Sequence, residues 1–138
     1  MLRVSGATHA ILLLGTNDIG LAQLLPSEVV SSEQIIASMD AAITKAKAAG
    51  VRVYLGTLLP FKGAAVYYTE ATEAKRQSVN TWVRTSAKAD GVIDLDKALQ
   101  DPADSLAFLP AYDSGDHVHP NDAGYQAMAN AVDLNLLR

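Results

Sequence analysis

The 138-residue sequence contains no cysteine, which excludes a disulfide scaffold, a thiolate zinc site and a thiol nucleophile. It also lacks any run rich in lysine and arginine, and 15 acidic against 11 basic residues give a formal net charge of -4. Binding of nucleic acid through a basic face is therefore disfavoured. The absence of cysteine does not fix the compartment, because such a chain tolerates either redox environment.

Long hydrophobic runs are missing as well. The longest apolar run, Ala10 to Leu14, is far too short to cross a bilayer, so we expect no membrane span. The first residues are not followed by the apolar core of a signal peptide, and we expect a soluble chain without an export address, whose localisation stays unknown. A composition of 49% hydrophobic and 19% charged residues is ordinary for one globular domain, here predicted to span residues 1–138.

The hydrophobic patterns predict three strand-helix units. Strands are expected over residues 10–14, 51–58 and 92–95, and the first of them is apolar on both faces, as in a buried parallel sheet. Amphipathic patterns predict helices that begin after the caps Ser31, Thr69 or Thr72, and Asn121, the last running to the C-terminus. This order is typical of a parallel, three-layer α/β sheet with right-handed crossovers.

Two further expectations concern the second half of the chain. In the helix after Thr72, an inward stripe of apolar residues contrasts with charged residues expected to face water; the stripe is Ala74, Val79, Trp82, Val83 and Ala87, and the charged residues are Glu73, Lys75, Arg76 and Lys88. Proline and glycine punctuate residues 101–120, which we expect to be irregular.

In parallel sheets, ligands bind beyond the carboxyl ends of the strands. Three loops should converge there: Gly15 to Asp18, Thr57 to Lys62, and Asp113 to Asn121. In the third loop, Asp116 stands three residues before His119, so its carboxylate can turn back onto the imidazole and support it as a proton acceptor. The alternative is a surface loop with two solvated histidines.

The first loop, Gly15-Thr16-Asn17-Asp18, directly follows the buried strand. Its position would place the Asn17 amide at the sheet edge, where an N–H₂ group can donate a hydrogen bond to an oxyanion. The alternative is an ordinary turn, because glycine, threonine, asparagine and aspartate are all frequent in turns.

Together these segments resemble the SGNH hydrolases, also called GDSL esterases and lipases. Gly15–Gly20 is similar to the family block with the oxyanion asparagine, and Asp116–Tyr125 to its Asp-x-x-His-Pro block; the resemblance also includes Thr57–Phe61, Arg76–Arg84 and Asp113–Asp116. It covers essentially the whole chain. It implies a flavodoxin-like sheet, hydrolysis of small or short-chain carboxylic esters without a metal or other cofactor, and the following roles: Asn17 as oxyanion donor, His119 as general base, Asp116 as the acid that orients it, and Gly15, Thr16 and Asp18 at the substrate.

The sequence departs from this family at its start. Members begin with a strand that carries Gly-Asp-Ser, whose serine attacks the ester, whereas this chain begins after that block and we expect an N-terminally truncated domain. Ser5 and Ser114 are the candidate substitute nucleophiles, but neither stands in a Gly-Asp-Ser context. Without a serine, a water molecule activated by His119 would attack the ester carbonyl directly.

Two other functions stay open. A truncated relative can serve as a binding or assembly module without turnover. A metal-dependent hydrolase can use His117 and His119 as alternating ligands, with oxygen from Asp113, Asp116 and Asp122 nearby.

The truncation also predicts an oligomer. In the resembled family the missing first strand would lie beside Ala10–Leu14, so its absence leaves this strand at an open edge that seeks a partner. We expect a homodimer or larger assembly that covers this edge. A partner strand that brings Ser5 to the site is a separate hypothesis.

Overall fold

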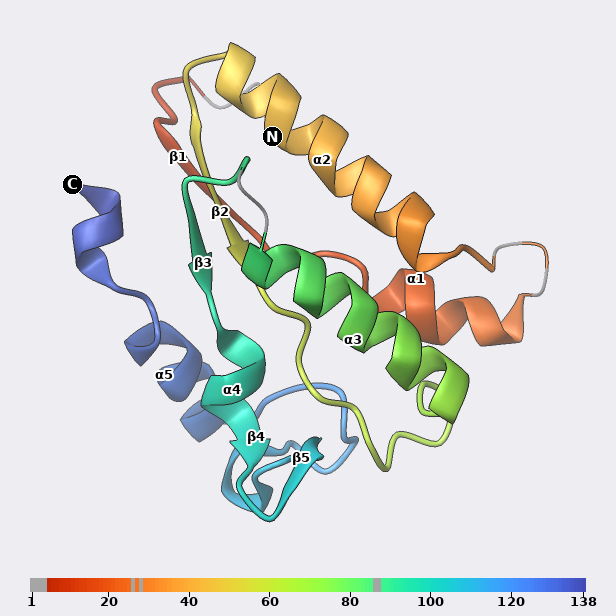
Figure 1. Ribbon diagram of the computed structural model, residues 1–138. Coiled ribbons are helices and arrows are strands. Elements are labelled where there is room, and N and C mark those ends of the chain that lie inside the picture. Colours follow the sequence, from red (N-terminus) through yellow and green to blue (C-terminus); the bar gives the residue numbers. More distant parts are fainter. Residues whose placement is uncertain (1–4, 26, 28, 86–87) are drawn as a thin grey trace.

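The computed structural model describes residues 5–25, 27, 29–85 and 88–138 (Figure 1). The principal strands are β1 (His9–Leu12), β2 (Arg52–Gly56) and β3 (Gly91–Ile93). The longer helices are α2 (Ser32–Ala48), α3 (Glu70–Thr85) and α5 (Asp122–Asn130). Shorter elements complete the chain: α1 (Thr16–Gly20), η1 (Leu21–Leu24), α4 (Leu95–Leu99), β4 (Gln100–Asp101), β5 (Asp104–Phe108), η3 (Pro110–Tyr112) and η4 (Leu134–Leu137).

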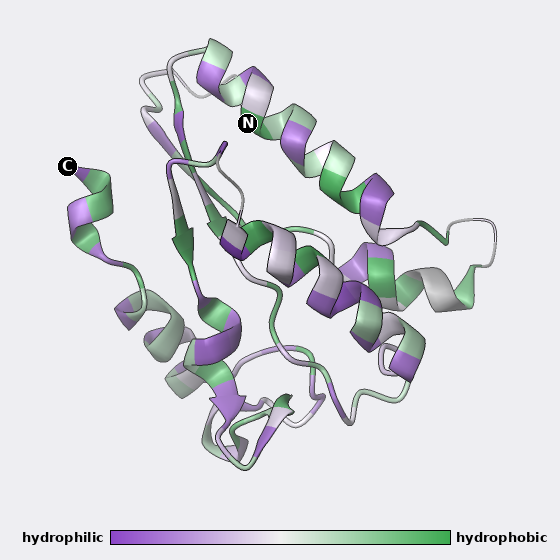
Figure 2. Cartoon of the chain, viewed as in Figure 1, coloured by the Kyte–Doolittle hydropathy of each residue, from purple (hydrophilic) through white to green (hydrophobic). Residues whose placement is uncertain are grey.

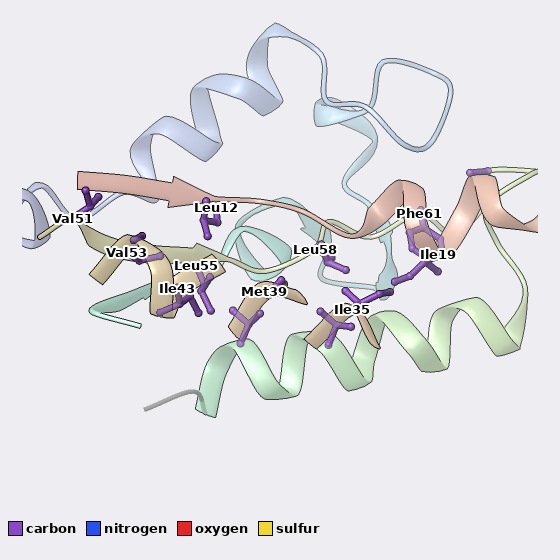
Figure 3. Packing of buried hydrophobic residues seen from close by; sticks show 14 residues of the cluster. Leu12, Ile19, Ile35, Met39, Ile43, Val51, Val53, Leu55, Leu58 and Phe61 are labelled. Atoms are coloured by element: carbon purple, nitrogen blue, oxygen red, sulfur yellow. The ribbon is translucent and has the colours of Figure 1, made fainter. Parts of the chain in front are cut away.

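The three principal strands form a parallel sheet in the order β1-β2-β3. Helices α2 and α3 cover one face of this sheet, and α5 lies on the opposite face (Figures 1 and 3). The structure therefore confirms the predicted three-layer α/β fold with a parallel sheet.

The alternating side chains of β2 divide the core in two. Val53 and Leu55 point toward α2 and α3 and belong to the larger buried cluster, part of which is drawn in Figure 3. Tyr54 points to the other face, where it packs with Ile93 in a second cluster that α5 and the C-terminal segment cover. Because β2 is buried on both faces, it is the strand around which the layers assemble.

Local signals place α2 and α3. Ser31 and Gln34 form the predicted capping box at the start of α2, in which the Gln34 backbone N–H donates to Ser31 Oγ at 3.3 Å. Thr69 and Thr72 satisfy each other at the start of α3, where each backbone N–H donates to the other hydroxyl. Along α3, hydrophobic and hydrophilic bands alternate, as expected of an amphipathic helix (Figure 2).

The first strand differs in part from its prediction. It covers residues 9–12 rather than 10–14, and it is not buried on both faces, since Ile11 and Leu14 are 47% and 54% exposed. The reason is its place at the edge of the sheet that the described strands form. Among the described residues, β1 pairs only with β2, and exposed apolar side chains flank its other side.

The charged face predicted for α3 is wrong at two positions. Arg76 is fully buried and Glu73 is 6% exposed, whereas Ala74, assigned to the inward stripe, is exposed. Arg76 donates to both carboxylate oxygens of Glu73 and to Asp96 Oδ1 at 2.5 Å. Burial alone would lower the pKa of the guanidinium, but the Glu73 hydrogen bonds and the Asp96 charge outweigh it and raise that pKa. At this part of α3, charged side chains that pair with one another are buried in place of apolar ones.

Two other expectations fail in the C-terminal half. Residues 101–120 are not wholly irregular, because β4 and β5 pair as a short antiparallel hairpin. The last helix ends at Asn130 instead of the C-terminus, and the chain continues through η4. The proposed inward position of Ala87 lies outside the described residues. Within the described ranges, no helix combines the length and apolar character that a membrane span requires.

The ion network around Arg76 yields a stability prediction. We expect Arg76→Met to lower the free energy of unfolding by about 3–5 kcal/mol, because it leaves the Glu73 and Asp96 carboxylates buried without a counter-charge. Asp40→Ala is the control: it removes the exposed ion pair with Lys88 and should cost less than about 1 kcal/mol. Urea unfolding measures both variants, and equal losses would contradict a special role for the buried network.

Candidate active site

A cavity of about 320 Å³ lies beyond the carboxyl ends of β1 and β2. All three expected loops contribute to it, since its lining includes Gly15, Thr16, Asn17 and Asp18, Leu59, and Val118, His119 and Pro120. Leu13, Leu14, Tyr125 and Met128 complete the wall. Asn17 and His119, a hundred residues apart in the chain, thus face one small space.

The turn after β1 presents Asn17. Gly15 has φ 116°, in the left-handed region that favours glycine, and its carbonyl accepts the Ile19 N–H at 3.1 Å in the first turn of α1. Asn17 is exposed on this turn, and its Oδ1 accepts a hydrogen bond from Tyr67 Oη at 3.0 Å. With the amide oxygen bound in this way, the Asn17 N–H₂ group can donate a hydrogen bond to a ligand.

The loop before α5 is organised by side chains that bind its own backbone. Asp113 Oδ1 accepts the N–H groups of Gly115 and His117 at 2.8 and 3.1 Å, and His117 takes the unusual φ of 62°. Asn121 caps α5 by accepting the Gly124 N–H, while its Nδ2 donates to the Asp113 carbonyl. These bonds fix the short return that brings residue 119 back toward residue 116.

Asp116 and His119 form the predicted pair. His119 Nδ1 lies 2.7 Å from Asp116 Oδ2, while Asp116 Oδ1 accepts the backbone N–H groups of His119 and Val118, each at 2.8 Å. These hydrogen bonds, first that of the His119 N–H, hold the pKa of the Asp116 carboxyl well below its usual range. An ionised carboxylate on Nδ1 favours a proton there and leaves Nε2 as the acceptor. The side chains are 65% and 52% exposed, so water reaches the pair.

The candidate nucleophiles lie elsewhere. Ser114 Oγ donates to Asp116 Oδ1 at 3.0 Å, so its hydroxyl is bound to the acid of the pair. Ser5 precedes β1 and therefore stands toward the amino end of that strand, whereas the cavity lies beyond its carboxyl end.

Comparison with known proteins identifies the family. The GDSL-like lipase/acylhydrolase family matches residues 2–127. The chain belongs to this family. A GDSL-like lipase of Bacteroides thetaiotaomicron is similar in structure, with a TM-score of 0.75 and 22% identity over 92% of this chain and 60% of its own. A candidate acylhydrolase of Bacteroides fragilis aligns with a TM-score of 0.70 and 20% identity over 94% of this chain and 61% of its own.

The chain therefore spans about 60% of the length of these solved structures, and at such identity they bear on the fold alone. A comparison with curated proteins found no match.

The two histidines of the loop do not share a carboxylate in this GDSL-like chain. His117 Nδ1 lies 2.5 Å from Asp113 Oδ2, whereas His119 binds Asp116. Among the residues that the structure describes, no three histidine or carboxylate groups gather as metal ligands do. The geometry thus supplies two separate Asp-His pairs, of which His119 alone lines the cavity with Asn17.

Three residues of the site were not predicted as site residues from the sequence. Tyr67 binds Asn17 across 50 positions, and Tyr125 and Met128 line the cavity. The sequence does contain a pattern that points to Tyr125 and Met128. Helical spacing after the Asn121 cap places them one turn apart at the start of α5, on the same face. No such pattern points to Tyr67, since it stands in a turn without periodicity.

The depressed pKa of Asp116 predicts how the loop responds to acid. A carboxyl whose folded pKa lies below its unfolded pKa stabilises the fold above the unfolded value, and this contribution disappears as the pH falls through the folded value. The difference in unfolding free energy between the wild type and Asp116→Asn should therefore be constant above about pH 5 and shrink below about pH 4. Urea unfolding across pH measures it, and a difference that grew toward acid would reverse the sign.

Proposed function

We propose that this chain hydrolyses small carboxylic esters by direct attack of water, with His119 as general base and Asn17 as oxyanion donor. The observation that carries the proposal is the single cavity that both side chains line. The family of ester hydrolases to which the chain belongs supports the same reaction class. The cavity of about 320 Å³ suits a short ester, and its apolar wall residues, such as Leu59 and Met128, suit an acyl group.

The steps follow from the hydrogen-bond pattern. His119 Nε2 takes a proton from water as the resulting hydroxyl bonds to the ester carbonyl carbon, and Asp116 stabilises the imidazolium that forms. The negative carbonyl oxygen of the tetrahedral intermediate accepts a hydrogen bond from the Asn17 N–H₂ group. When the intermediate collapses, the carbon–oxygen bond to the alcohol breaks and His119 returns the proton to the leaving oxygen. The products are one carboxylic acid and one alcohol.

Water is preferred to serine as the nucleophile because of where Ser114 donates. A nucleophilic serine must give its proton to the base, whereas Ser114 Oγ donates to the acid, Asp116. Loss of a serine nucleophile costs on the order of a millionfold in kcat, while oxyanion and binding contributions leave roughly 10³ to 10⁴ over water. We therefore expect slow turnover.

Alanine variants test the assigned roles. With p-nitrophenyl acetate, His119→Ala should lower kcat by roughly 10² to 10⁴, because general-base catalysis is lost. Asn17→Ala should lower it by roughly 10² to 10³, because one oxyanion donor is lost. Release of p-nitrophenol measures both effects.

His9→Ala makes the same chemical change on β1, outside the cavity lining, and should leave the rate unchanged. Direct water attack also predicts no initial burst of p-nitrophenol and no acyl adduct in the intact mass. A burst together with an acyl adduct would show that a side chain of the protein, and not water, attacks the ester, and would contradict the proposed mechanism. Binding of the ester without turnover by the wild type would favour the binding module, and an unchanged rate in purified His119→Ala would remove the catalytic role.

We also propose that a second copy of the chain covers the open edge of β1. Within the part of the chain that the structure describes, no strand pairs with β1 on that side, and the exposed Ile11 and Leu14 flank it. Apolar side chains along an open edge favour association, and a closed homodimer is the simplest symmetric arrangement.

A charge placed at this edge tests the dimer. Ile11→Lys should shift the chain from dimer to monomer, because the lysine would have to be desolvated in the contact. Leu134→Lys is the matched control, since Leu134 is 68% exposed and belongs to η4 and not to β1. Light scattering behind size exclusion measures the mass, and a wild type that stays monomeric at high concentration would contradict the proposal.

A further inference from the structure

We infer that Tyr67 is a positioning residue that sets the orientation of the Asn17 amide, so that its N–H₂ group and not its oxygen faces the substrate. The assignment rests on the proposed function as far as catalysis is concerned. Its structural part, that the Tyr67 phenol fixes the Asn17 amide, stands on geometry alone.

The chemistry of the amide makes its orientation decisive. In the Asn17 side chain, Oδ1 accepts hydrogen bonds and the Nδ2 group donates them. An amide flipped about its Cβ–Cγ bond would therefore present its oxygen to a developing oxyanion. Tyr67 Oη donates to Asn17 Oδ1 at 3.0 Å, which occupies the acceptor side. Asn17 is exposed on a five-residue helix, so local packing alone restrains its side chain little. The phenol supplies the missing restraint.

The Tyr67 ring is held firmly enough to serve this purpose. A Cβ on Gly20 would lie 1.8 Å from Tyr67 Cδ1, so the ring lies directly against the α1 backbone, where a side chain larger than hydrogen would collide with it. On another side the ring contacts Phe61, which is fully buried, with a centroid separation of 6.4 Å.

The backbone of Tyr67 is fixed as well. Its N–H donates to the Ala64 carbonyl at 3.1 Å, and its carbonyl accepts the hydroxyl of buried Thr72 at 2.7 Å. The start of α3 therefore anchors the residue that orients Asn17. Tyr67 also lines a second cavity, of about 210 Å³, together with Asp116 and His119, so it adjoins both halves of the site.

Kinetics of Tyr67→Phe test the role. Loss of the hydroxyl should lower kcat for p-nitrophenyl acetate about 10-fold, with KM within about twofold, because the donor is misoriented rather than removed. Tyr68→Phe is the control: this neighbouring ring also contacts Phe61, and its loss of a hydroxyl should leave kcat unchanged. In an Asn17→Ala background Tyr67→Phe should have no further effect, since Tyr67 acts through Asn17. If Tyr67→Phe still lowered kcat 10-fold in the Asn17→Ala background, the inference would be overturned.

A second readout needs no activity. In a ¹H–¹⁵N spectrum, the side-chain signals of Asn17, identified by their loss in Asn17→Ala, should move in Tyr67→Phe and stay in place in Tyr68→Phe. Gly20→Ala, which displaces the ring, should move them too. Unchanged Asn17 side-chain chemical shifts in Tyr67→Phe would overturn the inference even if the protein is an active esterase. A wild type without hydrolysis would instead overturn the proposed function, while the spectrum would still decide whether Tyr67 orients the amide.

Discussion

A buried guanidinium binds the carboxyl end of β2 to the helices around it. Arg76 of α3 donates to the Leu58 carbonyl at 2.9 Å while its charge is balanced by Glu73 and Asp96. Asn80, one turn further along α3, accepts the Leu58 N–H and donates to the same carbonyl. The buried N–H and C=O of Leu58 are thus both satisfied by side chains of α3, and an unpaired buried backbone group would cost free energy comparable to a lost hydrogen bond. The next residue lines the cavity, so one wall of the site depends on this buried polar contact.

The two halves of the site are built differently. The half with His119, the proposed base, is local: Asp116 Oδ1 accepts hydrogen bonds from within its own loop, and the pairing of Asp116 with His119 spans three residues. The half with Asn17, the proposed oxyanion donor, is not local, because its amide oxygen accepts a hydrogen bond from Tyr67 in a turn 50 residues away. A change in the packing of α3 against the sheet would therefore alter the donor first and leave the Asp-His pair intact.

This difference also explains how far sequence reasoning reached. The Ser31–Gln34 capping box and the Asp116–His119 pair lie within a turn of each other in sequence, so their chemistry can be predicted from spacing. The order of strands and helices follows from hydrophobic patterns for the same reason. The burial of Arg76 cannot be predicted in this way. Helical periodicity assigns a charged residue to the exposed face, and only the fold brings its partner Asp96 within reach. The β4–β5 hairpin was missed because its first strand has two residues and leaves no alternating pattern.

The open edge of β1 and the exposure of the Asp116–His119 pair both concern the same cavity. Leu14, two residues beyond the end of β1, is 54% exposed, and it also lines the cavity that Asn17 and His119 share. A hydrogen bond to an oxyanion is worth far more where water is excluded, because the effective dielectric constant falls. In the single chain, the His119 side chain is 65% exposed, so water, the proposed nucleophile, reaches it, and the same water would screen the charges that form in the reaction. A second copy seated over Leu14 would enclose one side of this cavity, and assembly would then strengthen the electrostatic part of catalysis without contributing a catalytic residue.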